Sequence, residues 1–209
     1  MLRDPEGDDI PMNASTTITR LRAAIDAHDD ELAEKLVHRL TEEDESELIK
    51  LAASGSEDCC WWAVRALALV GSAKSVDVIA SKLADEDSAM RAAGALALAH
   101  LYTRAPEAAR PAIPALAAML TDPDGLVRQA AADALARCGD DAVAALGVVL
   151  DSLHDGARAR AAYALRKIGT RNAAALLYPL LDDPNHLVRS YAYDGLDDLG
   201  LMQNIVVAP

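Results

Sequence analysis

Phenylalanine is absent from this chain of 209 residues, and aromatic residues make up only 3% of it. Strands rely on β-branched and aromatic side chains, whereas Ala and Leu, which dominate here, favour helices. The composition therefore predicts an all-α protein. Because 52% of the residues are hydrophobic, the chain has enough apolar side chains for one core or one continuous array, and disorder throughout is excluded.

Cysteine is also scarce, with Cys59, Cys60 and Cys138 as the three present. A disulfide between the adjacent pair would need a strained ring, so we expect reduced thiols and a cytoplasmic protein. The sequence has no run of eighteen or more apolar residues, and its first fifteen residues lack the apolar centre of a signal peptide. These absences predict a soluble chain that does not associate with a membrane.

Basic residues are outnumbered, because 20 Lys and Arg face 33 Asp and Glu and leave a net charge of −13. The acidity is concentrated in residues 1–58, which contain 16 acidic residues against six basic ones. A chain this acidic repels phosphate backbones, and no basic stretch outweighs the field. We therefore expect no nucleic-acid partner.

Residue patterns for catalysis or metal binding are missing too. The five His residues lack the spacing of metal ligands, and none of them precedes a Glu. The sequence contains neither a Gly-rich phosphate loop nor a nucleophile motif. We predict a protein that is not an enzyme and has no metal and no cofactor.

One stretch of the chain recurs. DPDGLVRQAAADALARCG at residues 122–139 returns as DPNHLVRSYAYDGLDDLG at residues 183–200. With Arg128 as the reference, five units align, and each has Leu seven residues later and small residues three and six residues later. Four units end in Gly, which predicts a left-handed helix end. The reference column reads Cys60, Arg91, Arg128, Arg158 and Arg189, and the glycines are Gly71, Gly139, Gly169 and Gly200.

A second helix is predicted in each of the first four units, after the first helix has ended. These four units are therefore helical hairpins. The second unit has a longer turn between its two helices, because residues 102–110 are an insertion. Beside the apolar stripe of the second helices, the first unit carries the charged Lys82. At these positions the later units carry uncharged side chains, among them Met119, Val148, Val149 and Tyr178. Repeats of this kind build a surface instead of a catalytic pocket.

The chain divides into four predicted segments. Residues 1–14 form a flexible acidic leader, residues 15–55 a divergent helical N-terminal cap, residues 56–200 the five units with the last one half complete, and residues 201–209 a tail. Ser15 or Thr16, Asp29 or Asp30, and Thr41 are the expected helix caps of the second segment.

A hairpin of about 31 residues with Asp six residues before Arg resembles the HEAT repeat, and more closely the short HEAT-like repeats named after phycobilisome lyases. The resemblance covers roughly residues 56–200 and implies a right-handed α-solenoid. It also implies that these Asp and Arg residues form a structural ladder between repeats. The ladder residues are Asp85, Arg91, Asp122, Arg128, Arg158, Asp183 and Arg189, while Ser152 and Cys60 depart from the pattern.

In HEAT-like solenoids the second helices line the concave face, so the resemblance implies an apolar groove there. Its predicted partner-binding residues are Lys82, Met119, Val148, Val149 and Tyr178. Folding of the tail over this groove, or simple tight packing, is the alternative. Trp61 and Trp62 point about 100° apart on a helix, so one is expected to be buried and the other to offer an aromatic contact.

Three functions remain open from the sequence. The first is a non-catalytic scaffold that binds a partner protein or peptide in the predicted groove. The second is a bilin lyase or chromophore-handling protein, which only the family resemblance suggests. The third is self-association as a homodimer through the last repeat, whose missing second helix leaves an apolar edge.

Overall fold

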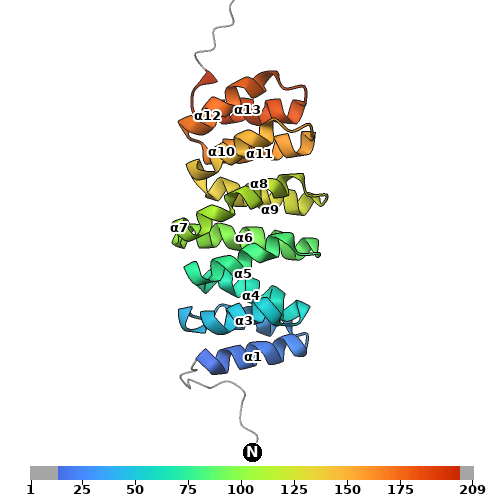
Figure 1. Cartoon of the computed structure of the whole chain (residues 1–209), viewed down its shortest axis with the longest axis vertical. Helices are drawn as coiled ribbons and strands as arrows, with labels where there is room; N and C mark the ends of the chain where they lie inside the picture. Colours follow the sequence, from blue (N-terminus) through green and yellow to red (C-terminus); the bar gives the residue numbers. More distant parts are fainter. Residues whose placement is uncertain (1–13, 203–209) are drawn as a thin grey trace, which may run out of the picture.

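Residues 14–202 are described by a computed structural model, and they form a column of stacked helices (Figure 1) without a strand. The first helices of the five units are α4 (Glu57–Val70), α6 (Ser88–Arg104), α9 (Gly125–Arg137), α11 (Asp155–Ile168) and α13 (His186–Asp198). The second helices are α5 (Val76–Ser81), α8 (Ile113–Ala118), α10 (Val143–Leu150) and α12 (Arg171–Leu177), most of them flanked by 3-10 turns. The predicted all-α solenoid of hairpins is confirmed.

The N-terminal part contains α1 (Ala14–Asp26), α2 (Asp30–Val37) and α3 (Glu45–Ser54). Asp29 caps α2 by accepting the Leu32 N–H at 3.0 Å, as expected. Thr41 forms a capping box with Asp44 ahead of α3, also as expected. The first helix begins at Ala14, before the Ser15 or Thr16 cap that the sequence predicted. Since α2 packs on α4 and α3 on α5, these helices continue the stacking of the later hairpins.

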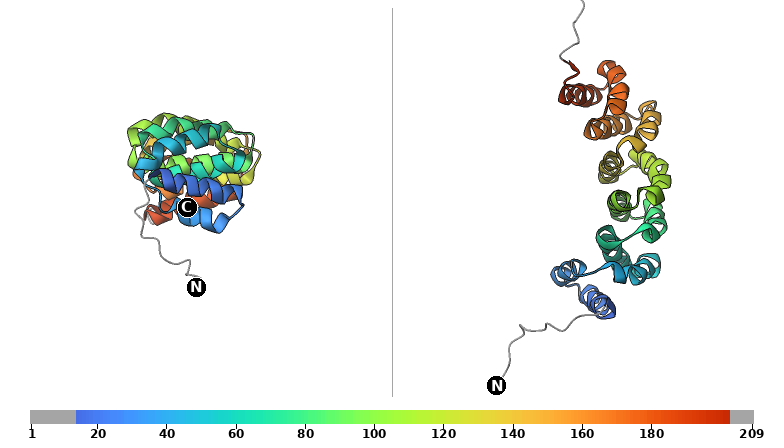
Figure 2. Two further views of the ribbon diagram at one scale, coloured as in Figure 1. Left: turned by 90° about the horizontal axis from the view of Figure 1, so that it is seen from below. Right: turned by 90° about the vertical axis from the view of Figure 1, so that its left-hand side faces the viewer.

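The first helices stack directly on one another, α4 on α6, α6 on α9, α9 on α11 and α11 on α13. Seen along the helices, the column bends, with α6, α9, α11 and α13 on the concave side and α8, α10 and α12 on the convex side (Figure 2, right). Fully buried Ala side chains, among them Ala95, Ala99 and Ala132, let the first helices approach closely. The column bends toward the more closely packed layer. The expectation that second helices line the concave face is therefore wrong.

The insertion at residues 102–110 lengthens α6 to Arg104 and adds a short helix, α7 (Pro106–Ala109). Its two ends both bind Asp141, in the turn before α10, the second helix of the third unit. The Tyr102 hydroxyl donates to the Asp141 carboxylate, and Arg110 Nε lies 2.8 Å from Asp141 Oδ2. The insertion thus connects the second unit to the third.

Three of the four predicted glycine helix ends are left-handed, with φ of 60° at Gly139, 62° at Gly169 and 69° at Gly200. The prediction is wrong at Gly71, whose φ is −65°. A Cβ at Gly71 would lie 2.5 Å from the Leu67 carbonyl oxygen. Close approach of the chain, not a positive φ, requires glycine there.

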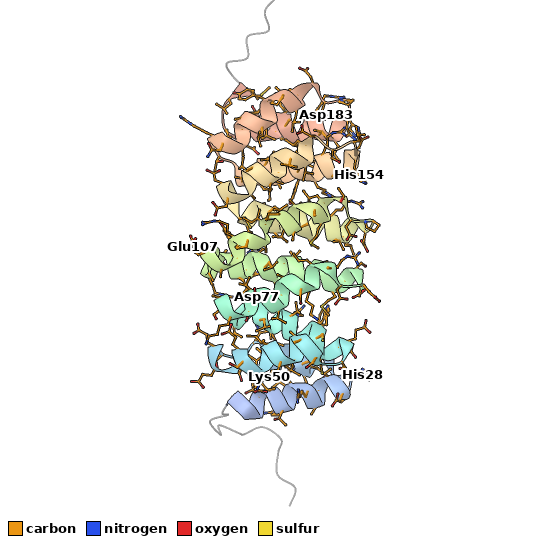
Figure 3. All side chains as sticks on the ribbon, in the orientation of Figure 1. His28, Lys50, Asp77, Glu107, His154 and Asp183 are labelled. Atoms are coloured by element: carbon orange, nitrogen blue, oxygen red, sulfur yellow. The ribbon has the colours of Figure 1, made fainter. Side chains whose placement is uncertain are left out.

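The predicted ladder has two ion-paired rungs. Arg91 Nε lies 2.8 Å from Asp122 Oδ2, and Arg158 Nε lies 3.1 Å from Asp183 Oδ2. In both, a second guanidinium N–H donates to the other carboxylate oxygen. Each rung joins the first helix of one unit to the turn before the first helix of the next. Figure 3 shows that turn at Asp183, with His154 on the same edge of the column and Glu107 on the opposite edge.

Cys60 replaces the ladder arginine of the first unit. Its thiol lies 3.4 Å from the carbonyl oxygens of both Leu51 and Gly55, so it donates to the preceding turn as the arginines do, but it cannot pair with Asp85. All three cysteines are free and buried. Burial raises the pKa of the Cys138 thiol to about 12, which makes it a poor nucleophile.

Glu45 joins the N-terminal helices to the repeats. It is buried, and it accepts hydrogen bonds from the Ser72 N–H at 2.6 Å and from the Ser75 hydroxyl at 2.6 Å. Burial acts to raise its pKa, but the hydrogen bonds from Ser75 and Ser72 outweigh this and lower it from the ordinary 4.5. The ionised carboxylate is therefore the form that the fold stabilises.

We expect Glu45→Gln to destabilise the protein by about 1–2 kcal/mol at neutral pH, because charge-assisted hydrogen bonds are lost. A lowered folded pKa means that this stabilisation is complete above the ordinary pKa of 4.5 and is lost as pH falls through the folded value. The variant should then show a shallower loss of stability in acid. Denaturant unfolding at several pH values measures both effects. Glu47→Gln, an exposed site on the same helix, is the control, and an equal effect there would contradict the role of Glu45.

Candidate partner-binding groove

The concave side carries a cleft of about 600 Å³, here called the concave groove, which runs across α4, α6 and α9. Its walls are mostly apolar, and a few polar side chains lie among them. Within the described residues, the side chains that define it are His38, Trp61, Arg65, Leu69, Leu96, His100, Leu126, Gln129 and Asp133, with alanines of the same three helices between them.

Two tryptophans build the N-terminal end of the concave groove. Trp62 is buried at 7% exposure, while Trp61 is only partly buried and lines the groove. Their rings meet edge to face with centroids 5.0 Å apart. The sequence-based expectation of unequal burial is confirmed, and the contact role of the pair stays a prediction.

Arg65 holds this aromatic pair in place. Its guanidinium carbon lies 5.1 Å from the Trp61 ring centroid and 5.5 Å from that of Trp62. The same guanidinium pairs with Glu34 of α2 at 2.6 Å. Cation–π and ionic contacts together order a large aromatic surface before any partner arrives, which lowers the entropic cost of binding.

Three leucines of the concave groove are exposed to an unusual degree. Leu69 of α4 is 43% exposed, Leu96 of α6 is 44% exposed and Leu126 of α9 is 75% exposed. They lie on three successive first helices and so form an apolar stripe across the repeats. Contiguous exposed apolar side chains on a soluble protein commonly mark an interaction surface.

Beyond α9 the concave side becomes polar and its side chains pair with one another. The Tyr163 hydroxyl donates to Asp133 at 2.8 Å, and Arg166 binds Asp194 at 2.8 Å and Asp198 at 3.1 Å. Burial, followed by the hydrogen bond to Asp133, raises the pKa of Tyr163. These contacts join α9, α11 and α13, and the exposed apolar side chains of α13 are Leu187 and Tyr193.

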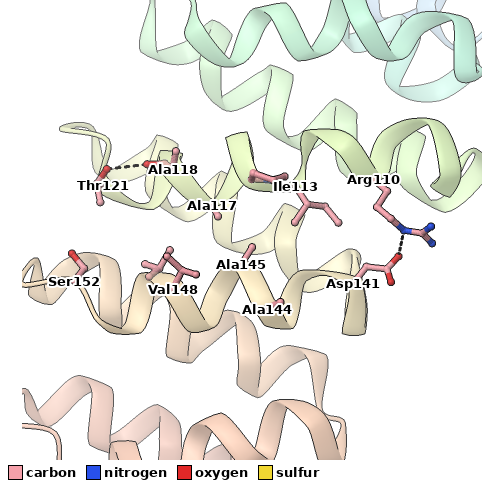
Figure 4. A pocket seen from close by; sticks show the side chains of 12 residues that line it. Arg110, Ile113, Ala117, Ala118, Thr121, Asp141, Ala144, Ala145, Val148 and Ser152 are labelled. Carbon is pink, nitrogen blue, oxygen red and sulfur yellow. Dashed lines mark hydrogen bonds and ion pairs between the residues drawn. The ribbon is translucent and has the colours of Figure 1, made fainter.

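The convex side has a second cleft of about 690 Å³ between α8 and α10, here called the convex cleft (Figure 4). Val148, which is 74% exposed, and Val149 both line it. The Arg110–Asp141 ion pair closes one end, and Thr121 and Ser152 lie at the other end. The cleft exists because the second helices diverge on the outside of the bend.

The predicted groove residues do not line the concave side. Val148 and Val149 lie in the convex cleft, and Tyr178 is 41% exposed where the fourth unit's second helix ends. Met119 is buried at 6% exposure, and Lys82 packs its Cβ against Gly94. Their assignment to the concave face was wrong because they belong to second helices. Whether the exposed ones contact a partner stays a prediction.

Sequence reasoning missed Arg65, Leu69, Leu96 and Leu126. The signal was present in the aligned first helices, where the column five residues after the reference reads Arg65, Leu96, Asp133, Tyr163 and Asp194. Like the column nine residues after the reference, and unlike the small-residue columns three and six residues after it, this column has no Ala or Gly in any unit. Within the described residues, no cluster of His, Cys, Asp and Glu could hold a metal ion, and no helix is long and apolar enough to span a bilayer.

This fold and this groove define the class of α-solenoid repeat proteins. Residues 113–197 match the family model of HEAT repeats, so the resemblance read from the sequence is confirmed over that range. A comparison with curated proteins gives no match. Among solved structures, 87 chains match.

Two similar structures show the fold alone. An engineered protein has a TM-score of 0.52 and 22% identity, with 91% of this chain and 93% of that chain covered. A designed armadillo repeat protein in complex with the peptide (KR)4 has a TM-score of 0.52 and 17% identity, with coverage of 86% and 98%.

A third similar structure is the complex of CpcE and CpcF of phycocyanin lyase from Nostoc sp. PCC7120. It has a TM-score of 0.54 and 27% identity. The match covers 77% of this chain and 65% of that chain, so this chain spans less than two thirds of it.

Proposed function

We propose that this protein is a non-catalytic scaffold that binds a partner protein or peptide along the concave groove. The observation that carries the proposal is the exposed stripe of Leu69, Leu96 and Leu126 beside the ordered Trp61 ring. Trp and Arg are the residue types enriched at binding hot spots, and Trp61 lies against Arg65 beside this stripe. The stripe crosses three helices, which suits an amphipathic helix or an extended peptide laid along the column.

The similar structures support this proposal at the level of fold. One is a designed repeat protein in complex with a peptide, and another is a complex of two lyase chains. Both are assemblies in which a helical solenoid contacts a polypeptide. The paired polar side chains beyond α9 leave the stripe as the part of the concave side that gains most from being covered.

The experiment compares charge insertion on the two sides of the column. Leu96→Asp places a carboxylate in the concave groove, and Val148→Asp places one at a more exposed site in the convex cleft. With wild-type chain as bait, the captured partner is purified and titrated against each variant. We expect Leu96→Asp to weaken binding at least about 100-fold and Val148→Asp to leave it within about twofold.

Both leucine and valine are exposed enough that neither variant should alter the helical circular dichroism signal. If Leu96→Asp and Trp61→Asp both bind like wild type, the concave groove is not the site. If Val148→Asp alone loses the partner, binding occurs in the convex cleft, which would favour the residues that the sequence first indicated.

A second candidate is handling of a tetrapyrrole chromophore, which the similarity to a phycocyanin lyase complex favours. The concave groove would bind such a ligand. The Trp61 ring could stack on the conjugated system, and the Arg65 guanidinium could pair with a carboxylate of the ligand. Mixing the purified chain with a free bilin and recording absorption tests this candidate. An unchanged spectrum would remove it.

A further inference from the structure

The ladder of ion pairs is interrupted where the third and fourth units meet. Arg91 pairs with Asp122 and Arg158 pairs with Asp183, but the residue placed to pair with Arg128 is Ser152. The chain therefore consists of two braced blocks, α6 with α9 and α11 with α13. The α9–α11 junction between them lacks this brace.

Arg128 is oriented as the paired arginines are. Its Nη1 donates to the Asp122 carbonyl at 2.6 Å and to the Pro123 carbonyl at 2.9 Å, just as Arg91 Nη1 donates to the carbonyls of Asp85 and Glu86 at 3.0 Å. A Cβ placed on Gly156 would lie 3.9 Å from Arg128 Nε, so the guanidinium reaches the first turn of α11, four residues after Ser152. Among the described residues no carboxylate pairs with it.

Ser152 occupies the backbone position of the ladder aspartates. Its Oγ accepts the His154 N–H at 3.1 Å, where Asp122 Oδ1 accepts the Asp124 N–H and Asp183 Oδ1 accepts the Asn185 N–H, both at 2.8 Å. The Ser152 carbonyl accepts from Arg158 Nη1 at 2.9 Å. The hydroxyl thus takes the place of one carboxylate oxygen but carries no charge.

The turn that contains Ser152 is open to solvent. Leu153 next to it is 98% exposed, and Ser152 itself is partly exposed at the end of the convex cleft (Figure 4). A modifying enzyme can therefore approach the hydroxyl. A phosphoryl group there adds a charge of about −1.5 to −2 at neutral pH and three acceptor oxygens, which suit the free Nε and Nη2 of an arginine.

We propose that Ser152 is a phosphorylation site and that its phosphate completes the missing rung with Arg128. A protein kinase would transfer the γ-phosphoryl group of ATP to Ser152 Oγ. The new bond joins Oγ to phosphorus, the bond from the β–γ bridging oxygen to phosphorus breaks, ADP leaves, and the hydroxyl proton passes to the kinase base. The product braces the α9–α11 junction and makes the column stiffer.

Two carboxylates oppose the phosphate. Asp151 is exposed, and Asp155 is already paired with Arg158 at 2.8 Å. Arg128 of α9 and Arg158 of α11 both face the turn, so their positive charge balances that of the two aspartates. Whether the phosphate stabilises the turn then depends on its pairing with Arg128. Aspartate at the same position in the third and fifth units shows that the turn tolerates an anion.

The test uses the full chain with phosphoserine encoded at position 152, alone and combined with Arg128→Met. We expect phosphorylation to raise Tm by about 3 °C and to slow amide hydrogen exchange in α9 and α11, and we expect Arg128→Met to abolish both gains. Phosphoserine at Ser54, at the exposed end of α3, should give no gain. An unchanged or lowered Tm, or a gain that persists in Arg128→Met, overturns the proposal.

Ser152→Asp provides a second measurement that does not depend on incorporating phosphoserine. It recreates the residue type of the intact rungs, so its gain in Tm should also disappear in Arg128→Met. Mass spectrometry of chain purified from its native cells with phosphatase inhibitors should locate phosphate on Ser152. Finding Ser152 unmodified under all growth conditions would count against the inferred site. So would additive changes in Tm from Ser152→Asp and Arg128→Met, because additivity means that the two side chains do not interact.

Discussion

Replacing Asp183 by Ala is expected to release α13, the first helix of the fifth unit, from the column while the central hairpins remain folded. The Asp183 carboxylate accepts from Arg158 Nε at 3.1 Å and Nη2 at 3.3 Å and from the Asn185 N–H at 2.8 Å. Both side chains of the pair are largely buried, at 7% and 10% exposure. Removing one partner of such a pair leaves a charge without compensation and costs about 3 kcal/mol.

The effect should be local because repeat arrays are stabilised mainly by contacts between neighbours. We expect amide protection in α13 to fall about 100-fold, the equivalent of about 3 kcal/mol, while α4 and α6 keep theirs. Hydrogen exchange followed by mass spectrometry resolves the two regions.

Asp85→Ala is the matched control for this prediction. Asp85 occupies the same column and accepts the Asp87 N–H at 3.1 Å, but Cys60 stands where its arginine partner would be. Its removal should cost far less. Equal losses from the two substitutions would mean that the turn hydrogen bond, and not the ion pair, supplies the stability.

The same carboxylates determine how the column responds to acid. Burial acts to raise the pKa of Asp183, but the Arg158 and Asn185 hydrogen bonds lower it below its ordinary value. The Arg91 hydrogen bond does the same for Asp122. A depressed folded pKa stabilises the protein above the unfolded pKa and loses that contribution as pH falls. The rungs therefore weaken only in strong acid.

The sequence could predict the hairpins, the rungs and most helix ends because each depends on residues that recur at the same positions of the aligned units. Arg91 and Asp122 lie 31 residues apart and Arg158 and Asp183 lie 25 apart, but both pairs occupy the same two columns, so one pair predicts the other. The bend could not be read in this way. The direction of the bend depends on whether the first helices or the second helices pack more closely. Many small contacts, such as those of Ala95 and Ala132, together determine this difference.

The candidate site was misplaced for the same reason. Apolar side chains on the second helices predict a groove only where those helices line the concave face, as the resemblance to HEAT-like solenoids implies. In this chain Val148 is exposed on the outside, and the inside carries Leu96 instead. Only the placement of α6 and α9 on the concave side made the column of Arg65 and Leu96 recognisable as a surface (Figure 2).

Gly94→Leu is the second substitution expected to have a large effect, because it acts on a close approach between the two layers. Gly94 is buried in α6, and a Cβ there would lie 3.0 Å from Lys82 Cβ, 3.4 Å from the Lys82 carbonyl carbon and 3.5 Å from the Ile79 carbonyl oxygen. A leucine must push the end of α5 away from α6, at a cost of about 3 kcal/mol or more.

Gly94→Ala separates side-chain volume from backbone freedom. Alanine already occupies this column in the other units, at Ala63, Ala131, Ala161 and Ala192. Its helix propensity exceeds that of glycine by about 1 kcal/mol, which offsets the few tenths of an ångström that Lys82 must yield. We expect Gly94→Ala to be nearly neutral in denaturant unfolding.

Because α6 packs on both α4 and α9, the leucine should lower protection on both sides of it, unlike the local loss expected from Asp183→Ala. Gly125→Leu is the exposed control, since a Cβ there would meet only Arg128 Nη2, at 3.5 Å. A Gly94→Leu chain as stable as Gly125→Leu would show that α5 is free to move outward, and the two layers would then be held by their ends and not by this contact.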